Sequence, residues 1–124
     1  MDPRKMPLGK LFQKVFLDRQ GYMPQALNTA NKKLNRFNLL ISKRDTFDDA
    51  TSPIGVIIKD WTRSIGVNSV IKAEHDAEEA GLNTVILVGN NFSLQARGMA
   101  SRANIRLVSR GELVVNFPTE LASF

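Results

Sequence analysis

The sequence has 124 residues, of which 43% are hydrophobic and 23% charged, and its formal net charge is +5. This length fits one domain with its own core and excludes two full-sized domains. With no cysteine and a single histidine, His75, the sequence excludes disulfides, a thiol nucleophile and zinc sites built from cysteine or several histidines. Any divalent metal would need carboxylate ligands.

Positive charge is concentrated in the first third of the chain. Residues 1–44 contain ten Lys or Arg and two Asp, a net charge of +8, whereas residues 45–124 contain seven basic and ten acidic residues, a net charge of −3. Such a basic surface attracts nucleic-acid phosphates, and it also occurs on subunits that dock to acidic proteins. With no membrane-spanning apolar run and no signal-peptide pattern, we expect a soluble cytoplasmic protein, nucleoid-associated or, in a eukaryotic host, nuclear.

The first predicted elements are an arm and a helix. Residues 1–7 hold two prolines and no periodic pattern, so we expect a flexible or loosely docked arm ahead of one domain over residues 8–124. Apolar residues in 8–19 recur at i, i+3, i+4, i+7 and i+8, which predicts an amphipathic helix stopped by Gly21. The polar stretch 25–36 fits either a short helix or a loop.

Two apolar stretches predict an antiparallel β-hairpin. Residues 37–42 and 54–61 are expected as strands, joined by the long connection 43–53, which carries Asp, Ser and Pro. The second strand is dominated by β-branched residues, which is typical of a strand buried on both faces. Its lysine, Lys59, either reaches solvent at the strand end or points into a cleft where phosphate binds.

The rest of the chain alternates helices and strands. The spacing predicts helices over 67–80 and 94–103 and strands over 84–88 and 105–108, with Gly81 ending the first helix and Ser93 capping the second. We expect a turn or a single helical turn over 109–113 and an extension of the sheet over 114–117. Because the two helices cross between strands, those strands should run parallel in a three-layer α/β sandwich with a mixed central sheet.

Several segments resemble the Mrr-like restriction endonucleases. The run 58–70 (IKDWTRSIGVNSV) is similar to their K-R-W, short turn, V-G-V and helix segment. The family also has a glycine-led strand, which residues 81–88 resemble. The helix and the strand that follow it in the family are similar to residues 91–96 and 100–113. The resemblance spans most of residues 8–113 and implies the restriction-endonuclease-like fold, called PD-(D/E)xK after its catalytic motif.

The catalytic positions of that family are changed here. Carried over, the Asp position falls on Asn38, the Glu or Gln position on Ile57, and only Lys59 is kept. In the family, the acidic or amide groups hold Mg²⁺ at the scissile phosphate and the lysine activates the attacking water. The resemblance therefore implies a degenerate, inactive site, with Glu74 on the next helix as a candidate displaced acid. Alternation along the strand places Asp60 on the face opposite Lys59.

We expect a module that binds nucleic acid, with DNA as the first expectation and with no metal or other cofactor. The candidate contacts are its basic residues Lys32, Lys33, Arg36, Lys43, Arg44, Lys59 and Arg63. One alternative is an active Mg²⁺-dependent DNA endonuclease that uses Asn38, Lys59 and Glu74. The other is a protein–protein module, as a homodimer or as a subunit of a larger transcription or DNA-processing complex. No membrane partner is expected.

Overall fold

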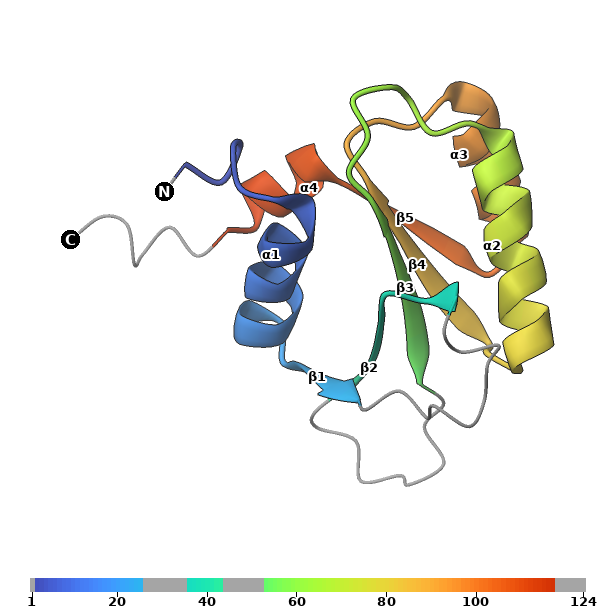
Figure 1. Ribbon diagram of the computed structural model, residues 1–124, viewed down its shortest axis with the longest axis horizontal. Helices are drawn as coiled ribbons and strands as arrows, with labels where there is room; N and C mark the ends of the chain where they lie inside the picture. The colour runs from blue at the N-terminus through green and yellow to red at the C-terminus, as the bar shows by residue number, and fades with distance from the viewer. Residues whose placement is uncertain (1, 26–35, 44–52, 118–124) are drawn as a thin grey trace.

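The computed structural model describes residues 2–25, 36–43 and 53–117, and it contains a five-stranded mixed sheet between two layers of helices (Figure 1). The strands lie in the order β1-β2-β3-β4-β5. Their bounds are β1 Tyr22–Gln25, β2 Leu39–Lys43, β3 Ile54–Lys59, β4 Thr84–Gly89 and β5 Ile105–Ser109. The helices are α1 Leu8–Gln13, which continues into the π-helical segment η1 Lys14–Arg19, then α2 Val67–Ala80, α3 Leu94–Arg102 and α4 Arg110–Val115.

The pairing confirms the predicted topology. Strands β2 and β3 are antiparallel, whereas β3, β4 and β5 are parallel to one another. Helices α2 and α3 connect the parallel strands β3, β4 and β5. Crossover connections of this kind are almost always right-handed, so two successive ones place both helices on the same face of the sheet. The predicted three-layer α/β sandwich with a mixed sheet is confirmed.

Each face of the sheet has its own core because side chains alternate along the strands. Ile57, Val85 and Leu87 face α2 and α3, and the intervening Val56 and Ile86 face α1. Figure 1 shows α1 on one side of the sheet and α2 with α3 on the other. β3 and β4 are therefore buried on both faces, which explains their nearly continuous apolar sequence.

The predicted helix boundaries agree closely with the structure. Gly21 (φ 80°) and Gly81 (φ 72°) adopt left-handed backbone conformations at the ends of the first helix and of α2, where glycine avoids a steric cost. Ser93 caps α3, since its Oγ accepts a hydrogen bond of 3.1 Å from the amide of Ala96. In the described residues, no helix is long and apolar enough to cross a bilayer.

Two elements differ from the prediction. The sequence patterns predict no element over β1, which pairs with the edge of β2. An edge strand tolerates Pro24 because one of its sides has no neighbouring strand that would need a backbone N–H. The predicted sheet extension over 114–117 is wrong. The Oγ of Ser109 accepts from the amide of Glu112 at 3.1 Å and starts α4, which buries Leu113 on the α1 side of the sheet.

A polar network joins the N-terminal stretch to the carboxyl ends of the strands. The Oδ2 atom of Asp60 accepts from the amide of Leu8 at 3.1 Å, which satisfies a donor at the start of α1. Its Oδ1 accepts from Asn90 at 3.0 Å and from Arg110 at 3.3 Å. Arg110 also donates to the carbonyl of Met6 at 2.6 Å. The network confirms that Asp60 lies on the face opposite Lys59.

Candidate nucleic-acid interface

Lys59 is the last residue of β3 and is paired in register with Gly89 of β4. It lies on the same face as Ile57, which is buried against the α2 side of the sheet. Its Nζ atom is 4.5 Å from the centre of the Trp61 ring, within the range of a cation–π contact. The side chain of Lys59 therefore leaves the sheet toward α2, at the carboxyl end of the central strand.

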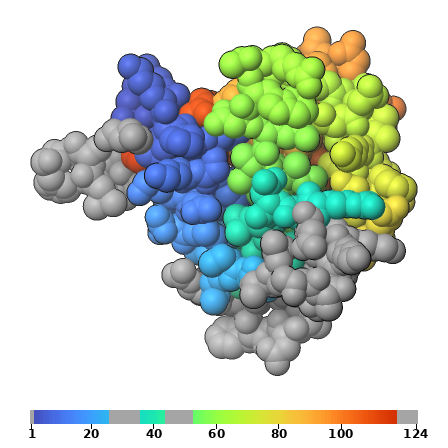
Figure 2. All heavy atoms as spheres, in the orientation of Figure 1, coloured from blue at the N-terminus to red at the C-terminus, as the bar shows by residue number. Residues whose placement is uncertain are grey.

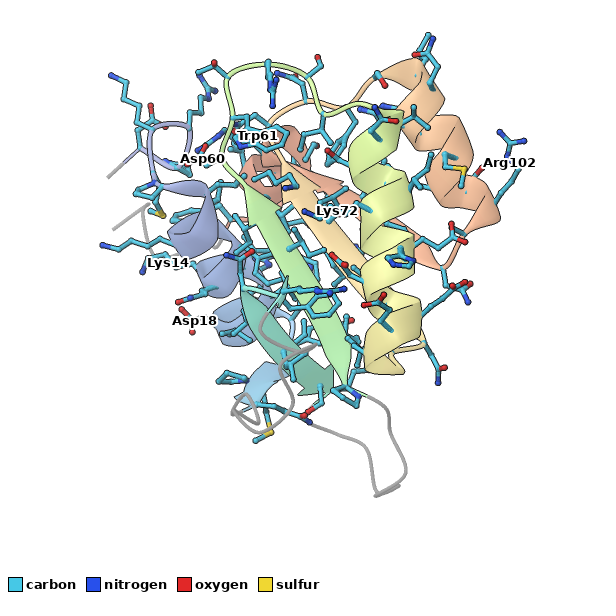
Figure 3. All side chains as sticks on the ribbon, turned by 45° about the vertical axis from the view of Figure 1, so that its right-hand side comes forward. Lys14, Asp18, Asp60, Trp61, Lys72 and Arg102 are labelled. Atoms are coloured by element: carbon cyan, nitrogen blue, oxygen red, sulfur yellow. The ribbon has the colours of Figure 1, made fainter. Side chains whose placement is uncertain are left out.

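A pocket of about 450 Å³ lies between this end of β3 and helix α2. We call it the cationic pocket. It is lined by Arg36, Ile57, Lys59, Ser69, Lys72, Ala73, His75 and Asp76. Figure 3 shows Lys72 on the side of α2 that faces the sheet, with Lys14 and Asp18 on the opposite layer. The pocket combines an apolar floor with cations from three separate parts of the chain.

Helical geometry explains why α2 contributes to this pocket. Ser69, Lys72, Ala73 and Asp76 are spaced at i, i+3, i+4 and i+7, so they form one stripe along the helix. Ala73 is 1% exposed and anchors the stripe against the sheet. Lys72 and Asp76 lie on either side of Ala73 along this stripe. Because Ala73 is packed on the sheet, both neighbours lie at the edge of the helix–sheet contact, where the pocket opens.

Asp76 is the buried acidic residue of the site. It is 5% exposed, and its Oδ1 accepts a hydrogen bond of 3.1 Å from Nη1 of Arg36. Arg36 also binds Glu79, which in turn lies 2.8 Å from Nε2 of His75. The hydrogen bond and charge of Glu79, with a smaller contribution from Asp76, raise the pKa of Arg36. The side chain of Arg36 therefore links the start of the segment 36–43 to α2. Figure 2 shows this segment on the surface of the molecule beside β3.

Electrostatics leave the cationic pocket with unneutralised positive charge. Burial lowers the pKa of Lys59, the charge of Lys72 lowers it further, and the carboxylate of Asp76 opposes the shift. Arg63 adds to the repulsion, and its guanidinium carbon lies 4.5 Å from the Trp61 ring centre. An anion that enters the pocket would relieve this repulsion.

The positions that correspond to the family's metal ligands lie side by side and are occupied by Asn38 and Ile57. Asn38 lies opposite Ile57 across the β2–β3 pairing, and its Oδ1 accepts a 2.8 Å hydrogen bond from the amide of Ile58. That oxygen is already engaged, and Ile57 has no ligand atom. Asp76 supplies one carboxylate, which Arg36 holds. Within the described ranges, no group of three acidic or histidine residues is arranged to hold a metal ion.

The structure places the other predicted residues as follows. Glu74 lines a different pocket, together with Glu78 and Arg102, and is not brought to Lys59. Arg63 is exposed beside Trp61, and Lys43 is exposed at the end of β2. Lys32, Lys33 and Arg44 lie outside the described residues.

Two residues of the cationic pocket, Lys72 and Asp76, were not predicted. Each looks in the sequence like one more charge on a solvated helix. The signal that identifies them is their spacing from Ala73, a small apolar residue of the buried stripe, because residues one and three positions away from it flank the helix–sheet contact.

The family model Mrr_cat, described as a restriction endonuclease, matches residues 10–115. The match extends from α1 to α4 and includes all five strands and every residue that lines the cationic pocket. None of the curated proteins matches the chain.

Proposed function

Because the chain belongs to the restriction endonuclease family whose model matches residues 10–115, we propose that it binds DNA through the cationic pocket without cleaving it. In this proposal Lys59 and Lys72 contact the phosphate backbone. Arg63, beside Trp61, extends the contact surface. The fold is kept from a nuclease, and the lysine of the former catalytic centre serves as a phosphate ligand.

The observation that carries the proposal is the convergence of Lys59 and Lys72 on one pocket. They come from the end of a buried strand and from the middle of α2, and the charge of Lys72 lowers the pKa of Lys59. Two lysines that line one pocket and repel each other favour an anion between them, because the anion offsets the repulsion. A DNA phosphate supplies that anion.

The donor set supports binding without hydrolysis. Cleavage by this family requires a divalent metal, and Mg²⁺ prefers carboxylate oxygens that are free to coordinate. At the corresponding positions the chain has Asn38, whose amide oxygen is engaged by the backbone, and Ile57. We therefore derive no hydrolytic step for this site.

A binding assay with matched variants tests the proposal. Lys59→Ala and Lys72→Ala should each weaken binding to a duplex by about tenfold at low salt, as expected for the loss of one charge-assisted contact. Lys14→Ala is the control because it removes the same charge from an exposed position on η1, in the opposite layer (Figure 3). Fluorescence anisotropy of a labelled duplex gives the three affinities.

Two outcomes would contradict the proposal. If all three variants bind equally, the interaction is non-specific attraction to a basic protein. If the wild-type protein binds no duplex or single-stranded DNA at low salt, the protein–protein alternative is favoured. Lys32, Lys33, Arg36, Lys43 and Arg44 stay proposed as supporting contacts from the charge distribution in the sequence, although the guanidinium of Arg36 is engaged by Asp76.

The buried carboxylate of Asp76 keeps metal-dependent cleavage as the second candidate. Asp76 lines the same pocket as Lys59, whereas Glu74 lines a different one. A supercoiled plasmid incubated with Mg²⁺ or Mn²⁺ distinguishes the two. We expect no nicking above the level of a Lys59→Ala preparation, whereas nicking that both Lys59→Ala and Asp76→Asn abolish would establish a nuclease.

A further inference from the structure

A carboxylate is an unexpected feature of a pocket that binds only phosphate. Asp76 is the one charged residue that is buried within the described ranges, and it lines the cationic pocket with Lys59, Lys72 and Arg36. Its Oδ1 accepts from Arg36, and no other hydrogen bond to this carboxylate is found among the described residues. A carboxylate that lines a pocket and can accept a further hydrogen bond favours a ligand that has a hydrogen-bond donor.

The pocket is also larger than a phosphate group requires. Its volume of about 450 Å³ lies within the range of pockets that hold whole small ligands, about 300–1,000 Å³. Ile57 and Ala73, which are 8% and 1% exposed, supply apolar surface beside the charged groups. Apolar surface, a cationic rim and a buried acceptor together match the planar ring, the phosphate and the amino group of a nucleotide.

We infer that the cationic pocket accepts one unpaired nucleotide, with its phosphate at Lys59 and Lys72 and the exocyclic amino group of its base donating to Asp76. This inference rests on the proposed DNA binding and specifies the form of DNA. A base inside a duplex cannot present its pairing edge to a pocket, so the nucleotide must come from a bulge or from a strand end. A carboxylate accepts readily from N4 of cytosine, whereas thymine presents the O4 acceptor at the same position.

The test compares DNA probes that differ at one nucleotide. The probes are a fully paired duplex, the same duplex with a single bulged dC, dT or abasic site, and the same duplex with a one-nucleotide dC overhang. We expect the bulged dC to be bound at least about tenfold more tightly than the paired duplex, because its base needs no unpairing. We expect dC to be preferred over dT by about fivefold. The overhang shows whether strand ends supply the nucleotide as well as bulges.

Asp76→Asn tests the contact with the base. An asparagine whose oxygen stays with Arg36 turns its amino group toward the pocket, so the preference should change from dC toward dT. Glu78→Gln is the matched control, since it makes the same change of charge on the same helix but lines the other pocket. Ser69→Phe is a second variant that leaves the buried charge intact. It should fill the pocket, so the ratio of the affinities for the bulged and the paired duplex should fall toward one.

The outcomes separate this inference from the proposed function. Equal affinity for the paired and bulged duplexes, with Lys59→Ala still weakening both, would overturn the inference and leave DNA binding in place. A preference for dC that Asp76→Asn and Ser69→Phe both leave unchanged would also overturn it. If the wild-type protein binds none of the DNA probes, the proposed function itself is overturned.

Discussion

Lys59 and Trp61 form a cation–π pair, with Nζ of Lys59 4.5 Å from the centre of the indole ring. The guanidinium carbon of Arg63 lies 4.5 Å from the same centre. Trp61 is the only tryptophan in the sequence, so the intrinsic tryptophan fluorescence of the protein comes from this residue alone. Its emission therefore reports on the environment of the proposed phosphate ligands.

We predict that DNA changes the tryptophan emission of the wild-type protein. Binding at Lys59 and Arg63 moves or neutralises the two cations that contact the ring, which alters the electric field at the indole. A fluorescence titration should give the same midpoint as anisotropy. Lys59→Ala should shift the midpoint to higher DNA concentration, and Lys14→Ala should not. An unchanged emission spectrum at saturating DNA would place the contact elsewhere.

Lys59→Met should stabilise the protein while weakening DNA binding. The pKa of Lys59 is lowered in the folded state, first by burial and then by Lys72, so the protonated side chain opposes folding. We expect a gain of about 0.5 kcal/mol at neutral pH, kept small because the ammonium is partly solvated and contacts Trp61. Urea denaturation measures it.

The pH dependence of that gain follows from the direction of the shift. As the pH rises through the lowered pKa of Lys59 the folded wild-type protein loses the charge, and the electrostatic advantage of Lys59→Met narrows. It should vanish above the ordinary lysine pKa of about 10.4. Lys14→Met is the control for loss of an exposed lysine. A less stable Lys59→Met protein at every pH would show that Lys59 contributes more to folding than its repulsion costs.

The contact between Arg36 and Asp76 should tie the chain ahead of β2 to α2. Arg36→Met leaves a buried carboxylate without its donor, so it should lower the melting temperature more than Arg97→Met, which removes an exposed arginine from α3. Adding Asp76→Leu to Arg36→Met should restore much of the loss, since an apolar pair replaces an unpaired charge. Additive effects in this double-mutant cycle would mean that the two residues are not coupled.

Asp60 should stabilise the fold without taking part in DNA binding. Asp60→Ala removes the acceptor for the amide of Leu8 and for Arg110, and we expect a loss of about 1 kcal/mol after allowing for solvent screening of the exposed side of the carboxylate. Asp18→Ala, at an exposed position on η1, should change stability little. Both variants remove one negative charge, so the DNA affinity of Asp60→Ala should differ from that of the wild type by no more than the affinity of Asp18→Ala does.

The contribution of Asp60 should depend on pH. Hydrogen bonds from Asn90 and Leu8, together with Arg110, lower its pKa, so the folded state favours the ionised form. This stabilisation is complete above the ordinary aspartate pKa of about 3.9 and is lost as the pH falls through the lower pKa of the folded protein. In thermal melts from pH 7 to pH 3, the difference between the wild type and Asp60→Ala should begin to narrow as the pH falls below about 3.9. A constant difference would contradict this origin.

The sequence patterns predicted most of the fold because the central elements are strongly periodic. The strands β3 and β4 are apolar on both faces, and α2 has a clear buried stripe that ends at Gly81. β1 was missed since four residues around Pro24 carry no strand pattern, and only the edge of β2 makes them a strand. The sequence predicts an extended segment at Val114 and Val115, because β-branched side chains favour strands, but both residues belong to α4. The cap at Ser109 starts this helix.

The candidate site was predictable only in part. Lys59 stood out as one charge in an apolar strand, and alternation correctly assigned Asp60 to the other face. The sequence offers no distinction among the charged residues of α2. It suggests Glu74 as the displaced acid, whereas Asp76 is the one buried in the pocket. Two positions along a helix correspond to a rotation of about 200°, so a small error in choice places the side chain on a different surface.

The central claim is that Lys59 and Lys72 neutralise DNA phosphates in the cationic pocket. The dependence of affinity on salt measures this most directly, since the slope of log K against log salt falls by about 0.9 for each phosphate contact that is lost from duplex DNA. We predict that Lys59→Ala/Lys72→Ala has a slope shallower by about one to two units than the wild type, and that Lys14→Ala keeps the wild-type slope. Identical slopes for the wild type and the double variant would contradict the claim.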